Sequence, residues 1–194
     1  NKNKGKKDAI TYIIENIEYS YYSFENLLDE LKREGFNEKL SISAIEACEI
    51  DWKEQALKCA KENLEYNNYS YKSLMKELID EKFTKEQVKY ALENCNENWN
   101  EQALKYVNET ISYGDDYTPS ELRDELECEE FKEENIKYAL KNCKIDWNAQ
   151  AVKTAKQYRE ENMYSRKEII EFLMEDDGYT SSQAQYGIKN SGIY

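Results

Sequence analysis

Histidine is absent from this 194-residue chain, and proline and glycine are scarce, at one and six residues. The missing histidine removes the side chain that proteins use most often as a general base and as a metal ligand. Few helix breakers remain, while leucine, alanine, glutamate and lysine are abundant, so the composition favours helices throughout. No apolar run approaches the ~20 residues that span a membrane. The sequence therefore predicts a soluble all-α protein.

Positive charge is also in short supply. Lysine and arginine total 27 against 40 aspartate and glutamate residues, which gives a formal net charge of -13. Such a surface repels the phosphates of nucleic acids, whose binding requires lysine and arginine. The five cysteines include no C-x-x-C pair, and we expect Cys48, Cys95 and Cys143 to lie apart as small buried thiols. We expect no metal, no cofactor and no catalytic residue.

A repeat dominates what is present. One ten-residue phrase occurs in three near-copies, at 47–56, 94–103 and 142–151. Its tryptophans, Trp52, Trp99 and Trp147, are 47 and 48 residues apart. A catalytic motif is needed only once in a chain, whereas copies of a motif at a fixed interval are typical of a repeated structural unit.

Helix start signals recur with the same period. In each copy a serine or threonine comes directly after a tyrosine, and an aliphatic residue comes four positions later, as expected at a helix N-cap. These N-cap residues are Ser23, Ser70, Thr118 and Ser165. A second start follows an aromatic residue, with capping-box spacing in Thr84–Gln87 and Thr180–Gln183. A third cap precedes each tryptophan, at Asp51, Asn98 and Asp146.

These signals predict tandem repeats of about 47 residues, each made of three short helices in a helix-turn-helix-like arrangement. About twelve short helices follow for the whole chain. We divide it into a basic tail at 1–7, a leading helix at 8–22, repeats at 23–69, 70–117 and 118–164, and a truncated repeat at 165–194.

Aromatic residues divide into two predicted classes. Nine are expected to form the repeated core: Trp52, Trp99, Trp147, Tyr90, Tyr138, Tyr186, Phe36, Phe83 and Phe131. Seven of the seventeen tyrosines cluster near the repeat junctions, namely Tyr19 and six candidate binding residues: Tyr21, Tyr66, Tyr71, Tyr106, Tyr113 and Tyr158. Tyrosine is favoured in protein interfaces, so these six either pack between repeats or line an acidic binding surface.

The helix-turn-helix pattern also raises DNA binding as an alternative. Lys58, Lys105 and Lys153 occupy equivalent positions and would form a basic ridge. Acidic residues flank most of them and the net charge opposes binding, so nucleic acid is an unfavoured partner.

The segment 69–107 resembles the Ltp family of host cell surface-exposed lipoproteins. The second copy carries the resemblance at Tyr69, Ser70, Leu74, Leu78, Phe83, Thr84, Gln87, Tyr90, Ala91, Trp99, Gln102 and Ala103. The third copy carries it at Tyr117, Thr118, Leu122, Phe131, Tyr138, Ala139, Asp146, Trp147, Gln150 and Ala151. Copy one departs from the pattern, with Ser43 in place of the tyrosine and Asn37 at the second cap.

The resemblance implies a helical binding module without catalysis, from Gram-positive bacteria or their prophages. It implies a protein on the outer face of the cell membrane, held by an N-terminal lipid anchor that is not in this chain. The function it implies is superinfection exclusion, in which binding of a phage protein blocks genome injection.

Two other readings stay open. A surface adhesion module with another ligand has the same features. A cytoplasmic acidic protein that mimics DNA and inhibits a nuclease or repressor fits the charge and the unpaired thiols. The sequence immediately upstream of Asn1 distinguishes a surface protein from a cytoplasmic one. A lipobox cysteine there supports the surface protein, and a start methionine supports the cytoplasmic protein.

Overall fold

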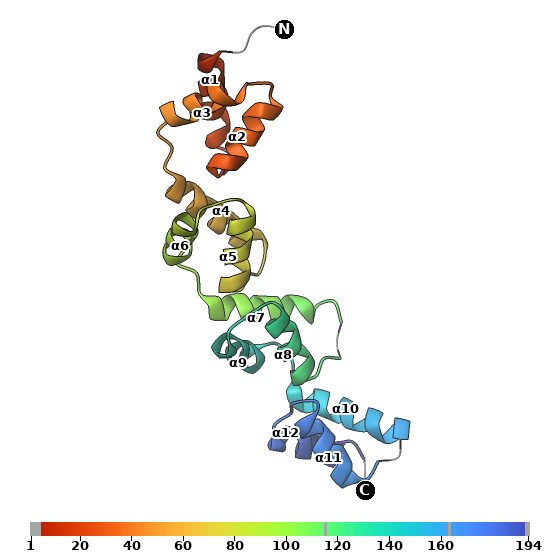
Figure 1. The fold of residues 1–194 in the computed structure, drawn as a ribbon. Helices are drawn as coiled ribbons and strands as arrows, with labels where there is room; N and C mark the ends of the chain where they lie inside the picture. Colours follow the sequence, from red (N-terminus) through yellow and green to blue (C-terminus); the bar gives the residue numbers. More distant parts are fainter. Residues whose placement is uncertain (1–4, 115, 163, 193–194) are drawn as a thin grey trace. The chain divides into compact units, whose positions relative to one another are not determined.

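The computed structural model of the protein describes residues 5–114, 116–162 and 164–192. These residues form twelve α-helices and no strand, as the sequence predicts (Figure 1). The helices are α1 (Lys6–Ile17), α2 (Phe24–Arg33), α3 (Glu38–Ala47), α4 (Trp52–Tyr66), α5 (Tyr71–Asp80), α6 (Lys85–Asn94), α7 (Trp99–Thr110), α8 (Pro119–Cys128), α9 (Glu133–Asn142), α10 (Trp147–Asn162), α11 (Arg166–Glu175) and α12 (Ser181–Asn190).

The predicted N-caps are confirmed. The hydroxyls of Ser23, Ser70, Thr118 and Ser165 each accept a hydrogen bond from the backbone N–H three residues later. Thr84 with Gln87 and Thr180 with Gln183 form complete capping boxes. Asp51, Asn98 and Asp146 cap the helices that begin with tryptophan. Because each cap satisfies otherwise unpaired amides, the sequence fixes where the helices begin.

Three consecutive helices pack together in each of four groups, named here group 1 (α1–α3), group 2 (α4–α6), group 3 (α7–α9) and group 4 (α10–α12). In every group the first helix contacts the third, and the second contacts the third (Figure 1). Each packed group begins one helix earlier than the repeats at 23–69, 70–117 and 118–164. The expected tail is also shorter, since Lys6 and Lys7 belong to α1, and its residues 1–4 lie outside the described part.

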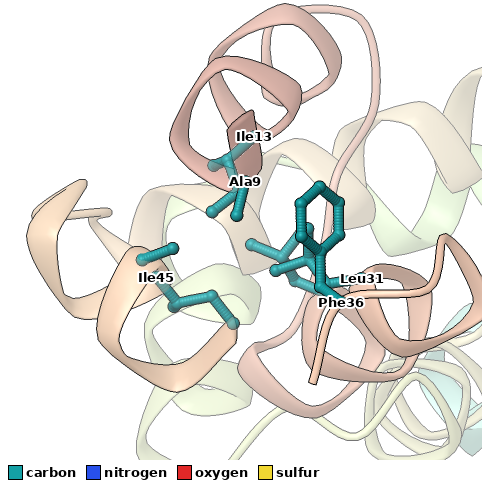
Figure 2. Close-up of a cluster of buried hydrophobic side chains, with 7 residues drawn as sticks. Ala9, Ile13, Leu31, Phe36 and Ile45 are labelled. Carbon is teal, nitrogen blue, oxygen red and sulfur yellow. The ribbon is translucent and has the colours of Figure 1, made fainter. Parts of the chain in front are cut away.

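The four cores use the same positions. Two aliphatic residues of the second helix are fully buried, namely Leu27 and Leu31, Leu74 and Leu78, Leu122 and Leu126, and Ile169 and Leu173. An aromatic after that helix closes the core, at Phe36, Phe83, Phe131 and Tyr179. Figure 2 shows this arrangement in group 1, where Ala9 and Ile13 of α1, Leu31 and Phe36, and Ile45 of α3 meet.

Small residues allow the first and third helices of each group to approach closely. The first helices carry Ala9, Ala56, Ala103 and Ala151, all fully buried. The third helices carry Ala44, Ala91, Ala139 and Gly187 at a matching buried position. A Cβ on Gly187 would lie 2.7 Å from the carbonyl oxygen of Ala151, so glycine is required for the spacing between α10 and α12.

The chain divides into two compact units, unit 1 (residues 1–97) and unit 2 (residues 98–194). Unit 1 contains groups 1 and 2, and unit 2 contains groups 3 and 4. Within unit 1, Asn26 of α2 donates to the backbone oxygen of Glu81 at 3.1 Å, and Lys82 pairs with Asp29 at 2.8 Å. Within unit 2, the N–H of Ser120 donates to the oxygen of Asp177 at 2.9 Å. In unit 1 the turn before α6 thus contacts α2, and in unit 2 the turn before α12 contacts α8.

Candidate functional site

Within residues 5–114, 116–162 and 164–192, no cluster of three histidine, cysteine, aspartate or glutamate side chains is placed to hold a metal ion. The five cysteines are not in disulfides. Burial raises the pKa of the Cys59 thiol to about 12. Burial also raises the pKa of Cys48, Cys95 and Cys143. Thiolates are the reactive form, so these four thiols are poor nucleophiles at neutral pH.

Two of the three tryptophans lie where one group meets the next within a unit. Trp52, the first residue of α4, packs on the core of group 1 and meets the Phe24 ring edge-on at 5.6 Å. Trp147, the first residue of α10, contacts the cores of groups 3 and 4. Its indole N–H donates to the carbonyl oxygen of Leu140 at 2.9 Å. Trp99 is half-buried at the start of α7. The two tryptophans with described contacts therefore link consecutive groups.

Two of the third-helix tyrosines are tied to the first helix of their group. The hydroxyls of Tyr90 and Tyr138 each donate to a glutamate, Glu54 and Glu101, at 2.6 Å. Tyr186 departs from the expected core position, because its side chain is 46% exposed. Ala149 stands where the other two groups have the glutamate, so Tyr186 lacks that carboxylate.

Four of the six candidate junction tyrosines are half-buried. Tyr21 hydrogen-bonds the thiol of Cys59, and burial raises its pKa to about 12. Tyr106 packs on Phe131 with ring centroids 5.9 Å apart. Tyr158 packs on Phe172 at 5.4 Å. Tyr71 is half-buried at the start of α5. At least three of these rings therefore pack within or between groups.

The other two junction tyrosines are among the most exposed large side chains. Tyr66 is 74% exposed and Tyr113 is 83% exposed. Tyr19, at the equivalent position of group 1, is 79% exposed. The 47-residue spacing from Tyr66 places Tyr19 in the same repeated position. The structure thus separates three exposed tyrosines from the packed ones.

Two of the three lysines considered for a basic ridge, Lys58 and Lys153, make contacts within the protein, and Lys105 is exposed. Lys58 donates to the carbonyl oxygens of Ile17, Glu18 and Ser20 at 3.2, 2.7 and 3.1 Å. Lys153 pairs with Asp116 at 3.0 Å. Both contacts join the first helix of one group to the segment after the first helix of the preceding group. These ammonium groups therefore hold groups together within each unit.

Replacing Lys58 with methionine is expected to destabilise unit 1 by about 1–2 kcal/mol. Methionine keeps an aliphatic stem but leaves the carbonyl groups that follow α1 without their charged donor. Hydrogen–deuterium exchange should show faster exchange in α1 and α4, with unit 2 unaffected. Lys61→Met, an exposed lysine on the same helix, serves as control. Equal stability of the Lys58 and Lys61 variants would contradict this role.

An open pocket of about 320 Å³ lies in unit 2. Its lining comes from the end of α7, the segment before α10 and the first turns of α10: Ile111, Lys144, Ile145, Asp146, Ala149, Gln150 and Lys153. Two of these residues, Gln150 and Lys153, already contact Asp116. The pocket thus combines a small apolar wall with polar groups that serve the contact between groups 3 and 4.

Asp177 is the one aspartate among the described residues whose pKa is raised. Burial raises its pKa from 3.8 to about 6, and the carboxylates of Asp176 and Glu121 add to the effect. The Tyr158 hydroxyl donates to one carboxylate oxygen at 3.3 Å, which opposes the rise. The other oxygen is buried without a hydrogen-bond partner in the described part of the chain.

Asp177→Asn is expected to stabilise unit 2 at pH 7 by about 1 kcal/mol, because the ionised carboxylate is less stable folded than unfolded. The folded pKa lies above the unfolded value, so wild-type stability rises relative to the variant as pH falls through 6 towards 4. Denaturant unfolding at pH 5 and 7 measures this difference. Glu175→Gln, at an exposed site, should show no such crossover. A variant that runs parallel to wild type across this range would refute the assignment.

The comparisons with known proteins agree with the helix groups. The model of a family described as host cell surface-exposed lipoprotein matches residues 51–95 and 146–190. No curated protein and no solved structure matches the chain. None of the described helices combines the length and apolar character that a membrane crossing requires. The matched segments coincide with group 2 and group 4. The chain therefore carries two repeats of the host cell surface-exposed lipoprotein family, one in each compact unit.

Proposed function

We propose that this protein is a non-catalytic binding module of the cell surface whose ligand is another protein. The match of groups 2 and 4 to a family of surface-exposed lipoproteins carries the proposal. The proposal places a lipid anchor on the N-terminal side of α1, so that the helix groups face outwards from the membrane.

The surface supports a protein ligand in two ways. Tyr19, Tyr66 and Tyr113 offer large, rigid, amphipathic rings to a partner. The net charge of -13 favours a basic partner and steers its approach over long range. Association with such a partner weakens as ionic strength rises. A complex that is insensitive to salt would contradict the electrostatic part of the proposal.

The specific role we propose is superinfection exclusion. In this role the protein binds a component of an incoming phage and blocks entry of the phage genome. The family resemblance supports this role, and the acidic, tyrosine-bearing surface supplies a means of binding a basic phage protein.

A phage challenge tests the role. Cells display the protein on a lipid anchor, and adsorption and genome entry are scored separately across a panel of phages. Cells that display the anchor alone are the control. Normal adsorption with failed entry is the expected result. Unimpeded entry of every phage would refute exclusion and leave a surface adhesion module with another ligand.

A further inference from the structure

Three exposed tyrosines occupy one repeated position. Tyr19, Tyr66 and Tyr113 are 47 residues apart, and each lies at the end of, or just after, the first helix of its group. Their exposed fractions are 79%, 74% and 83%. A ring this exposed contributes little to the core, so packing gives no reason for tyrosine at all three positions.

The neighbouring sequence repeats as well. The segments read ENIEY at 15–19, ENLEY at 62–66 and ETISY at 109–113. Each begins with a glutamate four residues before the tyrosine, and the three glutamates are exposed: Glu15, Glu62 and Glu109. Glu62 and Tyr66 both belong to α4, where residues four apart lie on the same face of the helix, whereas Tyr19 and Tyr113 lie in the turns that follow α1 and α7. Each of the three groups therefore carries an exposed tyrosine and an exposed glutamate four residues before it in the chain.

Local hydrogen bonds hold the backbone of these tyrosines. The N–H of Tyr19 donates to the oxygen of Asn16, and that of Tyr113 to the oxygen of Thr110, both at 3.2 Å. Tyr66 ends α4, and the next N–H donates to the oxygen of Asn63 at 3.0 Å. Lys58 binds carbonyl groups on both sides of Tyr19. The rings are thus presented from ordered backbone, which lowers the entropy cost of binding.

The protein contains an internal example of the chemistry that such a pair offers. The ammonium of Lys53 lies 5.9 Å from the centroid of the Tyr90 ring, while the Tyr90 hydroxyl donates to Glu54. A cation, a tyrosine face and a glutamate are therefore compatible within one small site on this scaffold. The ring attracts the cation through its quadrupole, and the carboxylate adds charge complementarity.

We propose that Tyr19, Tyr66 and Tyr113, each with its glutamate, are three docking points for arginine or lysine side chains of a basic protein segment. This inference rests on the proposed function, in which the ligand is a protein. The net charge of -13 makes a cationic segment the complementary partner. Tyr19 and Tyr66 belong to the same compact unit, so a partner that engages both binds more tightly than it would through one.

Peptide binding tests the docking points. The probe is a fluorescein-labelled deca-arginine peptide, and its fluorescence anisotropy is titrated with the full chain in 150 mM salt. The variant Tyr19→Ser/Tyr66→Ser/Tyr113→Ser leaves the net charge unchanged. A cation–π contact of the usual strength corresponds to about a two- to fivefold change in affinity, so the triple variant should bind at least about tenfold more weakly.

Two further variants keep the test specific. The corresponding triple Tyr→Phe variant retains the rings and should bind within about threefold of wild type. Tyr186→Ser removes an exposed tyrosine outside the repeated position and should bind like wild type. Circular dichroism checks that each variant stays folded. The proposal is overturned if the triple serine variant binds within twofold of wild type, or if Tyr186→Ser causes an equal loss.

The phage challenge separates this inference from the proposed function. If wild type excludes phage and the triple serine variant retains full peptide affinity, the docking points fail and exclusion stands. If the triple serine variant loses peptide affinity and wild type excludes no phage, the docking points stand and exclusion fails.

Discussion

Trp147→Ala is expected to destabilise unit 2 by about 3 kcal/mol. The indole contacts the cores of groups 3 and 4, meets the Tyr179 ring edge-on at 6.3 Å, and donates to the oxygen of Leu140. Alanine removes all three interactions and leaves a cavity that neither group can fill alone. Hydrogen–deuterium exchange resolved by peptide should show faster exchange in both groups.

The location of the effect is as informative as its size. In repeat proteins the cost of a substitution falls mainly on one repeat and its neighbours, so exchange in α1–α3 should stay unchanged. Tyr186→Ala, on an exposed side chain of group 4, is the matched control and should alter stability by less than about 0.5 kcal/mol. If Trp147→Ala loosens group 4 alone, the tryptophan does not couple the two groups.

Gly187→Ala is expected to destabilise group 4 by about 2 kcal/mol, although alanine is the better helix former by about 1 kcal/mol. The added Cβ would lie 2.7 Å from the oxygen and 2.9 Å from the carbonyl carbon of Ala151. These are backbone atoms, so α10 and α12 must move apart and loosen the core around Ile188. Thermal unfolding followed by circular dichroism measures the loss.

The repeat itself suggests the opposite result. Ala44, Ala91 and Ala139 occupy this position in the other groups, so a repeat consensus would introduce alanine as a stabilising change. Gln185→Ala, at an exposed position of α12, measures the effect of alanine on the helix alone. A higher melting temperature for Gly187→Ala would show that the helices yield without cost.

The sequence predicted the starts of the helices well because each start depends on hydrogen bonds between residues that are close together in the chain. A threonine followed three residues later by glutamine favours a helix N-terminus through its own hydrogen bonds, as Thr84 and Gln87 do. The family resemblance rested on the same periodic residues, and the match confirms it over groups 2 and 4.

The grouping of helices was beyond the sequence pattern. A period of 47 residues is the same whether a repeat is counted from the serine cap or from the tryptophan. Only the contacts show that α4 packs with α5 and α6, so that each group starts with its tryptophan helix or its counterpart.

The sequence pattern also could not predict which individual tyrosines are buried. Tyr19 and Tyr21 are two residues apart in EYSYYS, yet one is exposed and the other hydrogen-bonds Cys59 of the next group. Tyr186 has the same place in its repeat as Tyr90, and its different environment comes from Ala149 on another helix. Such differences arise from tertiary neighbours, which a local pattern does not contain.

The placement of the tryptophans determines when each group can complete its core during synthesis of the chain. Ile50 and Trp52 pack on the core of group 1, and Ile145 and Trp147 pack on the core of group 3, although both tryptophans belong to the following helix. A ribosome that has released only residues up to Ala47 has delivered every helix of group 1, but not the residues that cover its core. Group 1 is therefore completed by the first residue of group 2, and group 3 by the first residue of group 4. Each of these two cores is therefore complete only when translation has passed the last helix of the group by five residues, from Ala47 to Trp52 and from Asn142 to Trp147.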